Sequence, residues 1–243
     1  MLVLDDGWFG SRDSDNAGLG DWFVNTDKLK GGLADLVTGI NGLGMKFGIW
    51  IEPEMVNEDS RLYREHPDWA LTIPGRKPCR SRNQLVLDMS RSEVRDYVFD
   101  SIAAVLKSAN VEYVKWDMNR SICDVYSAVL PKERQVYHRY VLGIYDLMER
   151  FTSSFPNILF EGCSGGGGRF DPAILYYSPQ IWCSDDTDGI ERLEIQYGTS
   201  FFYPISAVGS HVSAIPNHQT GRRTPLATRG VVAMAGSFGY EMD

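Results

Sequence analysis

Short apolar runs alternate with amphipathic segments of helical periodicity along the chain. Strands that alternate with helices predict a parallel sheet and an α/β fold, and mostly apolar strands suit a sheet covered on both faces. Seven strands are expected, one fewer than a closed (β/α)8 TIM barrel contains. We therefore predict an incomplete barrel that occupies residues 1–243 as one domain. The expected strands are residues 2–4, 47–51, 111–116, 158–160, 181–182, 201–208 and 238–242.

The helical segments carry recognisable end signals. Ser90 and Glu93 have the spacing of a capping box. Asp171 and Pro172 supply an N-cap residue followed by a proline at the first helical position, and Gly44 stands where a helix C-cap is expected. The sequence thus predicts helices over residues 29–43, 90–106, 137–151, 190–197 and 224–235, and a short helix after Asp171.

Acidic residues follow several of the expected strands. Asp5 and Asp6 come after the first strand, Glu52 after the second and Asp117 after the third. TIM barrels carry their active sites at the carboxyl ends of the strands. Glycoside hydrolysis requires two carboxyl groups there, one ionised and one able to hold a proton. The pattern therefore favours a glycoside hydrolase.

Two acidic motifs are candidates for that chemistry. In the third strand, Lys115 and Asp117 point to the same side, so the lysine would lower the pKa of the carboxyl, as a nucleophile needs. An ordinary ion pair at a strand end is the alternative. Further on, Asp185, Asp186 and Asp188 crowd together, and like charges raise at least one pKa, as a proton donor needs. Here the alternative is a helix N-terminus rich in acids.

Composition narrows the partners. A net charge of −8 and a pI near 5.1 argue against a nucleic acid or an anionic membrane as partner. No apolar run is long enough to cross a bilayer, and no signal peptide is evident. Cys79, Cys123, Cys163 and Cys183 lack CxxC spacing, so we expect no metal, no cofactor and no disulfide framework, and a cytoplasmic location.

A rival interpretation centres on Ser164. Residues 162–166 match the G-x-S-x-G nucleophile elbow, and Asp185 and His211 follow in the order of an α/β-hydrolase triad. An elbow leads straight into a helix, however, and here a glycine-rich stretch delays the next helix. The same glycines lack the lysine of a phosphate-binding loop, and no G-x-G-x-x-G follows the first strand.

Several sequence blocks together resemble glycoside hydrolase family 36, the bacterial α-galactosidases or melibiases. The blocks are VLDDGWFG (3–10), GIWIEPEM (48–55), YVKWDMNR (113–120), FEGCSGGGGRF (160–170), IWCSDDTD (181–188) and IQYGTS (195–200). The resemblance implies a (β/α)8 barrel with a retaining, two-step mechanism. It implies that Asp117 is the nucleophile and Asp185 the acid/base, with Asp186 the weaker candidate. The residues that it implies for sugar binding are Asp5, Asp6, Trp50, Arg82, Lys115, Cys163 and Gly166.

The resemblance also implies features outside this chain. Family members carry flanking β-domains, and the first barrel strand and last helix would precede residue 1 and follow residue 243, so we expect a catalytic domain truncated at both ends. The implied substrate is an α-galactoside oligosaccharide of the melibiose or raffinose type, and full-length relatives are expected to be homo-oligomers. A galactosyl transferase of the raffinose-synthase kind and an inactive truncated fragment are the alternatives.

Overall fold

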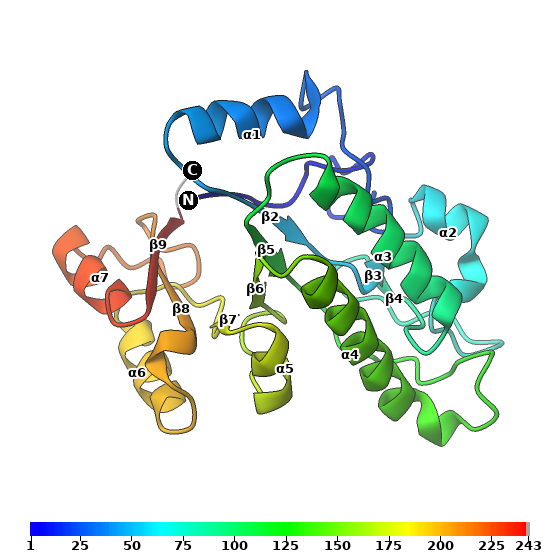
Figure 1. The fold of residues 1–243 in the computed structure, drawn as a ribbon. Coiled ribbons are helices and arrows are strands. Elements are labelled where there is room, and N and C mark those ends of the chain that lie inside the picture. The colour runs from blue at the N-terminus through cyan, green and yellow to red at the C-terminus, as the bar shows by residue number, and fades with distance from the viewer. Residues whose placement is uncertain (242–243) are drawn as a thin grey trace. The chain divides into compact units, whose positions relative to one another are not determined.

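The computed structural model describes residues 1–241, apart from the side chain of Glu133. The chain divides into two compact units, Met1–Leu159 and Phe160–Asp243. Each unit repeats the order strand, helix, strand, as Figure 1 shows along the colour gradient. Over the described residues, none of the helices combines the length and the apolarity needed to cross a membrane.

The first unit is built on three parallel strands. β1 (Leu2–Leu4) pairs with β2 (Phe47–Ile51), and β2 pairs with β5 (Tyr113–Trp116). The helices are α1 (Gly32–Gly42), α2 (Arg61–Glu65), α3 (Ser92–Lys107) and α4 (Val136–Ser154), with 3-10 turns η1 (Pro67–Trp69) and η2 (Glu133–Gln135). Two short strands, β3 (Met55–Val56) and β4 (Leu85–Val86), form an antiparallel pair.

Aromatic packing and close backbone contact hold this unit together. Every residue of β2 is buried, and Trp116 of β5 meets the ring of Phe151 edge-on, with ring centroids 5.7 Å apart. α3 and α4 run side by side as the two green helices of Figure 1. A Cβ atom on Gly143 of α4 would lie 1.9 Å from the carbonyl oxygen of Met89, so only glycine allows this close approach.

The second unit contributes four parallel strands. β6 (Leu159–Gly162) pairs with β7 (Gln180–Trp182), β7 with β8 (Val208–Ser213), and β8 with β9 (Ser237–Glu241). The connecting elements are α5 (Pro172–Tyr177), α6 (Glu191–Ser200), η3 (Ile205–Ala207) and α7 (Leu226–Ala233). As predicted, α5 is capped by Asp171, whose side chain accepts from the amides of Ala173 and Ile174 at 2.9 and 3.0 Å.

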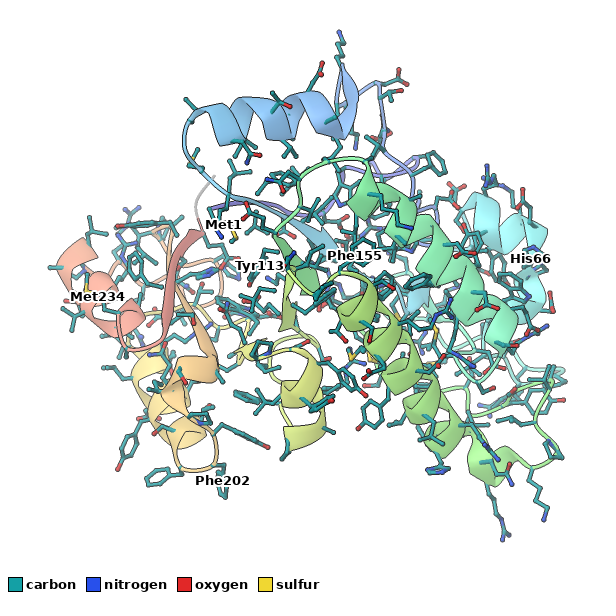
Figure 2. The ribbon with its side chains drawn as sticks, viewed as in Figure 1. Met1, His66, Tyr113, Phe155, Phe202 and Met234 are labelled. Carbon is teal, nitrogen blue, oxygen red and sulfur yellow. The ribbon has the colours of Figure 1, made fainter. Side chains whose placement is uncertain are left out.

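The α/β class and the seven parallel strands are confirmed. The strand expected over residues 201–208 is wrong, because Phe201 and Phe202 are 67% and 86% exposed and β8 begins only at Val208. Figure 2 shows the Phe202 ring pointing away from the ribbon. The last expected strand ends at Glu241 in the structure, and Met242 lies outside the described residues. A single domain over residues 1–243 stays a prediction.

Candidate active site

Asp117 lies directly after β5 and is only 6% exposed. Its backbone amide continues the parallel ladder by donating to the carbonyl oxygen of Ile51 at 2.8 Å. Its Oδ2 atom accepts from Trp50 Nε1 at 3.1 Å and from Asn119 Nδ2 at 2.7 Å. Its Oδ1 atom accepts from the amide of Met118 at 2.8 Å. These three donors fix the direction of the carboxyl group, which is what an attacking nucleophile requires.

Trp50 is itself fixed from behind. Its side chain is 4% exposed, and its carbonyl oxygen accepts from Trp8 Nε1 at 2.9 Å. Phe9 stacks over the Trp50 ring, with centroids 6.3 Å apart and planes inclined by 16°. Trp50 therefore positions Asp117 directly, a contact that the sequence reasoning did not foresee. Lys115 lies beside Trp50 in the register of β2 and β5.

Glu52 lies alongside Asp117, one residue beyond the end of β2. It is 1% exposed, and its two oxygens accept from the amide of Asn119 and from Gln84 Nε2. Burial, and after it the negative charge of Asp117, raise the pKa of Glu52 to about 8. A buried carboxyl group with a raised pKa thus lies beside a second carboxyl group at the ends of neighbouring strands, an arrangement typical of active sites.

The paired acids after β1 have different surroundings. Asp6 forms a bidentate contact with Arg12, whose Nε and Nη2 atoms donate to the carboxylate at 3.0 and 2.7 Å. Arg12 is only 3% exposed and also donates to the carbonyl oxygen of Ala17 at 3.1 Å, so it forms a rigid support for Asp6. Asp5 is exposed and accepts from the amide of Asp6 at 2.9 Å.

Arg82 occupies a strained turn. Both Arg82 and Asn83 have left-handed backbone conformations, with φ of 51° and 57°, in a turn closed by the amide of Gln84 donating to Ser81 at 3.0 Å. Each such residue costs roughly 1–3 kcal/mol, and strain of this kind concentrates at functional sites. The exposed guanidinium of Arg82 is therefore presented by a defined turn, as a ligand-binding residue should be.

In the second unit, Asp185 lies on the loop after β7. Its side chain is exposed, and its Oδ1 atom accepts from Trp182 Nε1 at 3.0 Å. The loop is braced by Arg192 of α6, which is 2% exposed and lies over the Trp182 ring at 4.4 Å. Arg192 donates to the carbonyl oxygens of Ser184 and Asp186, each at 2.6 Å. Like Arg12, Arg192 is a supporting residue that the sequence reasoning missed.

The neighbouring acids are engaged in local structure. Asp186 Oδ1 accepts from the amide of Asp188 at 3.0 Å. Burial raises the pKa of Asp188, but hydrogen bonds outweigh burial and hold this pKa below its ordinary value. The donors are Thr220, the amides of Ile190 and Glu191, and Arg222. Asp188 therefore anchors the start of α6, while Asp185 presents its carboxyl group to solvent.

The glycine run after β6 packs against the Asp185 loop. Gly166 has φ of +84°, and a Cβ atom there would lie 2.9 Å from Ser184 Cα and 3.0 Å from the amide nitrogen of Asp185. A Cβ atom on Gly167 would lie 2.5 Å from the carbonyl oxygen of Cys183. The small residues are therefore required by backbone packing. Cys163, which precedes the run, is 4% exposed.

The geometry does not support Ser164 as a hydrolase nucleophile. Its hydroxyl accepts from Arg169 Nε at 2.6 Å, and the next helix after Ser164 begins only at Pro172. His211 instead packs on the Trp182 ring, with centroids 4.7 Å apart, and within residues 1–241 it makes no hydrogen bond to Ser164. The described residues also contain no cluster of three or more His, Cys, Asp or Glu side chains that could hold a metal ion.

Comparisons with known proteins agree on one family. The melibiase family model matches residues 1–243. The bifunctional alpha-galactosidase/sucrose kinase AgaSK of Mediterraneibacter gnavus is 66% identical over all of this chain, which covers 25% of that protein. Alpha-galactosidase AgaA of Geobacillus stearothermophilus is 60% identical over all of this chain, which covers 34% of AgaA. The chain thus spans a quarter to a third of the length of these curated relatives.

Solved structures give the same result for the fold. AgaA variants in complex with raffinose and with stachyose match this chain with a TM-score of 0.97 at 60% identity. Each match covers 99% of this chain and 34% of the solved chain. The incomplete (β/α)8 barrel predicted from the strand count fits these neighbours.

Proposed function

The chain belongs to the melibiase family, and from this membership we propose that it forms the catalytic region of a retaining α-galactosidase. The proposed substrates are oligosaccharides with a terminal α-linked galactose, because the AgaA variants were solved with raffinose and stachyose. The observation that carries the proposal is the environment of Asp117, a buried carboxyl group held by three hydrogen-bond donors at the end of a parallel strand.

In the proposed first step, Asp117 attacks the anomeric carbon of the galactoside from the face opposite the leaving group. The bond to the glycosidic oxygen breaks, and that oxygen takes a proton from Asp185. The product is a β-galactosyl ester of Asp117 together with the free leaving alcohol. The solvent exposure of Asp185 suits this role, because a general acid must regain its proton from water in every cycle.

In the second step, Asp185 removes a proton from a water molecule that attacks the same carbon. The ester bond breaks, Asp117 leaves as a carboxylate, and galactose is released with its α configuration retained. We assign the sugar hydroxyl contacts to Asp5, Asp6 and Lys115. Arg12 supports this assignment for Asp6, because its two hydrogen bonds hold the Asp6 carboxylate in one orientation. The remaining proposed contacts of the galactose are Trp50, Arg82, Cys163 and Gly166.

Turnover of p-nitrophenyl α-galactoside by the whole protein tests the proposal. Proton NMR of the first product should show α-galactose, with the β anomer appearing only later by mutarotation. First formation of β-galactose would exclude the double displacement, and no turnover of any α-galactoside would exclude the activity. Ser164→Ala is the control, because the proposed mechanism leaves its activity intact, whereas an esterase that used Ser164 would lose all turnover.

A further inference from the structure

Glu52 is a buried carboxyl group to which the proposed mechanism gives no role. Its Oε1 atom accepts from the backbone amide of Asn119 at 2.6 Å, and its Oε2 atom accepts from Gln84 Nε2 at 3.1 Å. With 1% of its surface exposed, Glu52 cannot be an incidental surface acid. Removing it would leave the amide of Asn119 without its acceptor, so Glu52 fixes the backbone at that residue.

Asn119 connects Glu52 to the nucleophile. While its backbone amide donates to Glu52, its side-chain Nδ2 atom donates to Asp117 Oδ2 at 2.7 Å. This bond is shorter than the 3.1 Å bond from Trp50 Nε1 to the same oxygen. The direction of the Asp117 carboxyl group therefore depends on where the backbone of Asn119 lies.

The strand register explains why these residues meet. Ile51 of β2 pairs with Trp116 of β5, so the next residues along the two parallel strands, Glu52 and Asp117, lie at the same level. Asp117 also donates its amide to Ile51 at 2.8 Å. Glu52 is thus supplied by the strand that neighbours the nucleophile strand, and it reaches the loop after β5 across that ladder.

We propose that Glu52 is a positioning residue for the nucleophile, which acts by holding Asn119 where its side chain orients Asp117. This inference rests on the proposed function only for the role of Asp117 as nucleophile. Glu52 does not touch the reacting atoms. Its contribution is to reduce the freedom of the carboxylate before attack, which lowers the cost of reaching the transition state.

Protonation of Glu52 is part of the arrangement. The charged groups that face it are Asp117 and Arg82. The guanidinium of Arg82 lowers the pKa of Glu52, but its effect is smaller than the increase caused by burial and by the charge of Asp117. With a pKa of about 8, Glu52 is neutral near pH 7, so Asp117 is not opposed by a second charge. Gln84 accommodates the neutral acid, because its buried Oε1 atom lacks a hydrogen-bond partner in the described chain and can accept from Glu52 after rotation of the amide.

The first test compares Glu52→Ala with Glu52→Gln in the whole protein. Alanine frees the backbone of Asn119, and we expect kcat to fall about 10²-fold with KM changed by less than about threefold. Glutamine has the shape and hydrogen bonding of the neutral acid, so it should restore most of the lost kcat. An unchanged kcat in a folded Glu52→Ala variant, or a Glu52→Gln variant as slow as alanine, would overturn the proposal.

The second test is the pH profile with α-galactosyl fluoride, whose leaving group needs no proton from Asp185. Ionised Glu52 opposes release of Asp117 as a carboxylate, so hydrolysis of the covalent intermediate should slow as the pH rises through about 8. The slowing should disappear in Glu52→Gln. Glu54→Gln is the matched control, since Glu54 is also buried but accepts from Trp116 and Tyr140, and this variant should keep the slowing. Persistence of the slowing in Glu52→Gln would contradict our assignment.

Thermal unfolding separates this inference from the proposed function. Because the folded pKa of Glu52 is raised from 4.5 to about 8, the folded protein binds more protons than the unfolded chain between these values. Stability from Glu52 is therefore complete below pH 4.5 and is lost as the pH rises through about 8. As the pH rises from 4.5 to about 8, the Tm of Glu52→Gln should therefore increase relative to the Tm of the wild type, even if no galactoside is turned over. If the difference in Tm between the two proteins did not change with pH, the conclusion that Glu52 is neutral near pH 7 would be wrong.

Discussion

Asp117 and Asp185 are carboxyl groups held in opposite ways. Asp117 is buried at a strand end and receives three hydrogen bonds, one of them from the buried Trp50. Asp185 is exposed on a loop, and its carboxyl group accepts a hydrogen bond from Trp182 Nε1. The support for Asp185 comes indirectly, from Arg192, which fixes the carbonyl groups on either side of it.

The difference matches the two roles proposed for them. A nucleophile must keep one orientation and does not exchange protons with solvent during the cycle, so burial and several donors suit it. An acid/base group gains and loses a proton in each cycle, so it needs access to water while its position is maintained. At Asp117, hydrogen bonds restrain the side chain itself. At Asp185, the hydrogen bonds from Arg192 restrain the backbone of the loop that carries it.

Replacing Asp117 by glycine should give the largest effect. Loss of the nucleophile is expected to lower kcat/KM by roughly 10⁴-fold or more. The glycine leaves space on the face that Asp117 attacks, and added azide should occupy that space and displace the leaving group directly. We therefore expect partial recovery of activity and a β-galactosyl azide product, identified by NMR. An α-galactosyl azide product from this variant would show that Asp117 is not the nucleophile.

Asp185→Gly should have a smaller effect that depends on the leaving group. General acid catalysis contributes about 10²–10⁴-fold, and p-nitrophenolate needs it least. We expect a large fall in kcat/KM with melibiose and a small one with p-nitrophenyl α-galactoside. Here the nucleophile is intact, so azide should attack the covalent intermediate and give α-galactosyl azide. Asp186→Gly is the control, and stronger leaving-group dependence in that variant would transfer the acid/base role to Asp186.

Much of the fold could be predicted because its signals are local. Alternating apolar runs identified the parallel strands, and Asp171 with Pro172 identified the start of α5. The predictions were wrong where tertiary contacts, and not the local sequence, determine the structure. The aromatic run at residues 201–203 looks like a strand, but Phe201 and Phe202 are exposed. Ser90 does not cap α3, because its hydroxyl donates to Asp88 at 2.5 Å.

The candidate site shows the same division. The acids at strand ends could be found from the sequence, because each follows an apolar run directly. Arg12 and Arg192 could not be found, and neither could the burial and the role of Glu52, since a buried charged residue has the same letter as an exposed one and only its partners reveal its role. The glycines of residues 165–168 were recognised, but the sequence did not show that Gly166 and Gly167 pack against the loop of Asp185.

Gly166→Ala should have the smallest effect and tests whether Asp185 depends on its loop. A Cβ atom would lie 2.9 Å from Ser184 Cα, so the loop must move, and we expect kcat/KM with melibiose to fall about tenfold. The fall should be smaller with p-nitrophenyl α-galactoside, whose leaving group needs less protonation. Gly165→Ala is the matched control, because Gly165 also has positive φ, +52°, but faces open space. Both substitutions place an alanine at positive φ, so both should lower the Tm through backbone strain. Equal losses of activity in the two variants would therefore mean that strain in the glycine run, and not displacement of Asp185, lowers the rate.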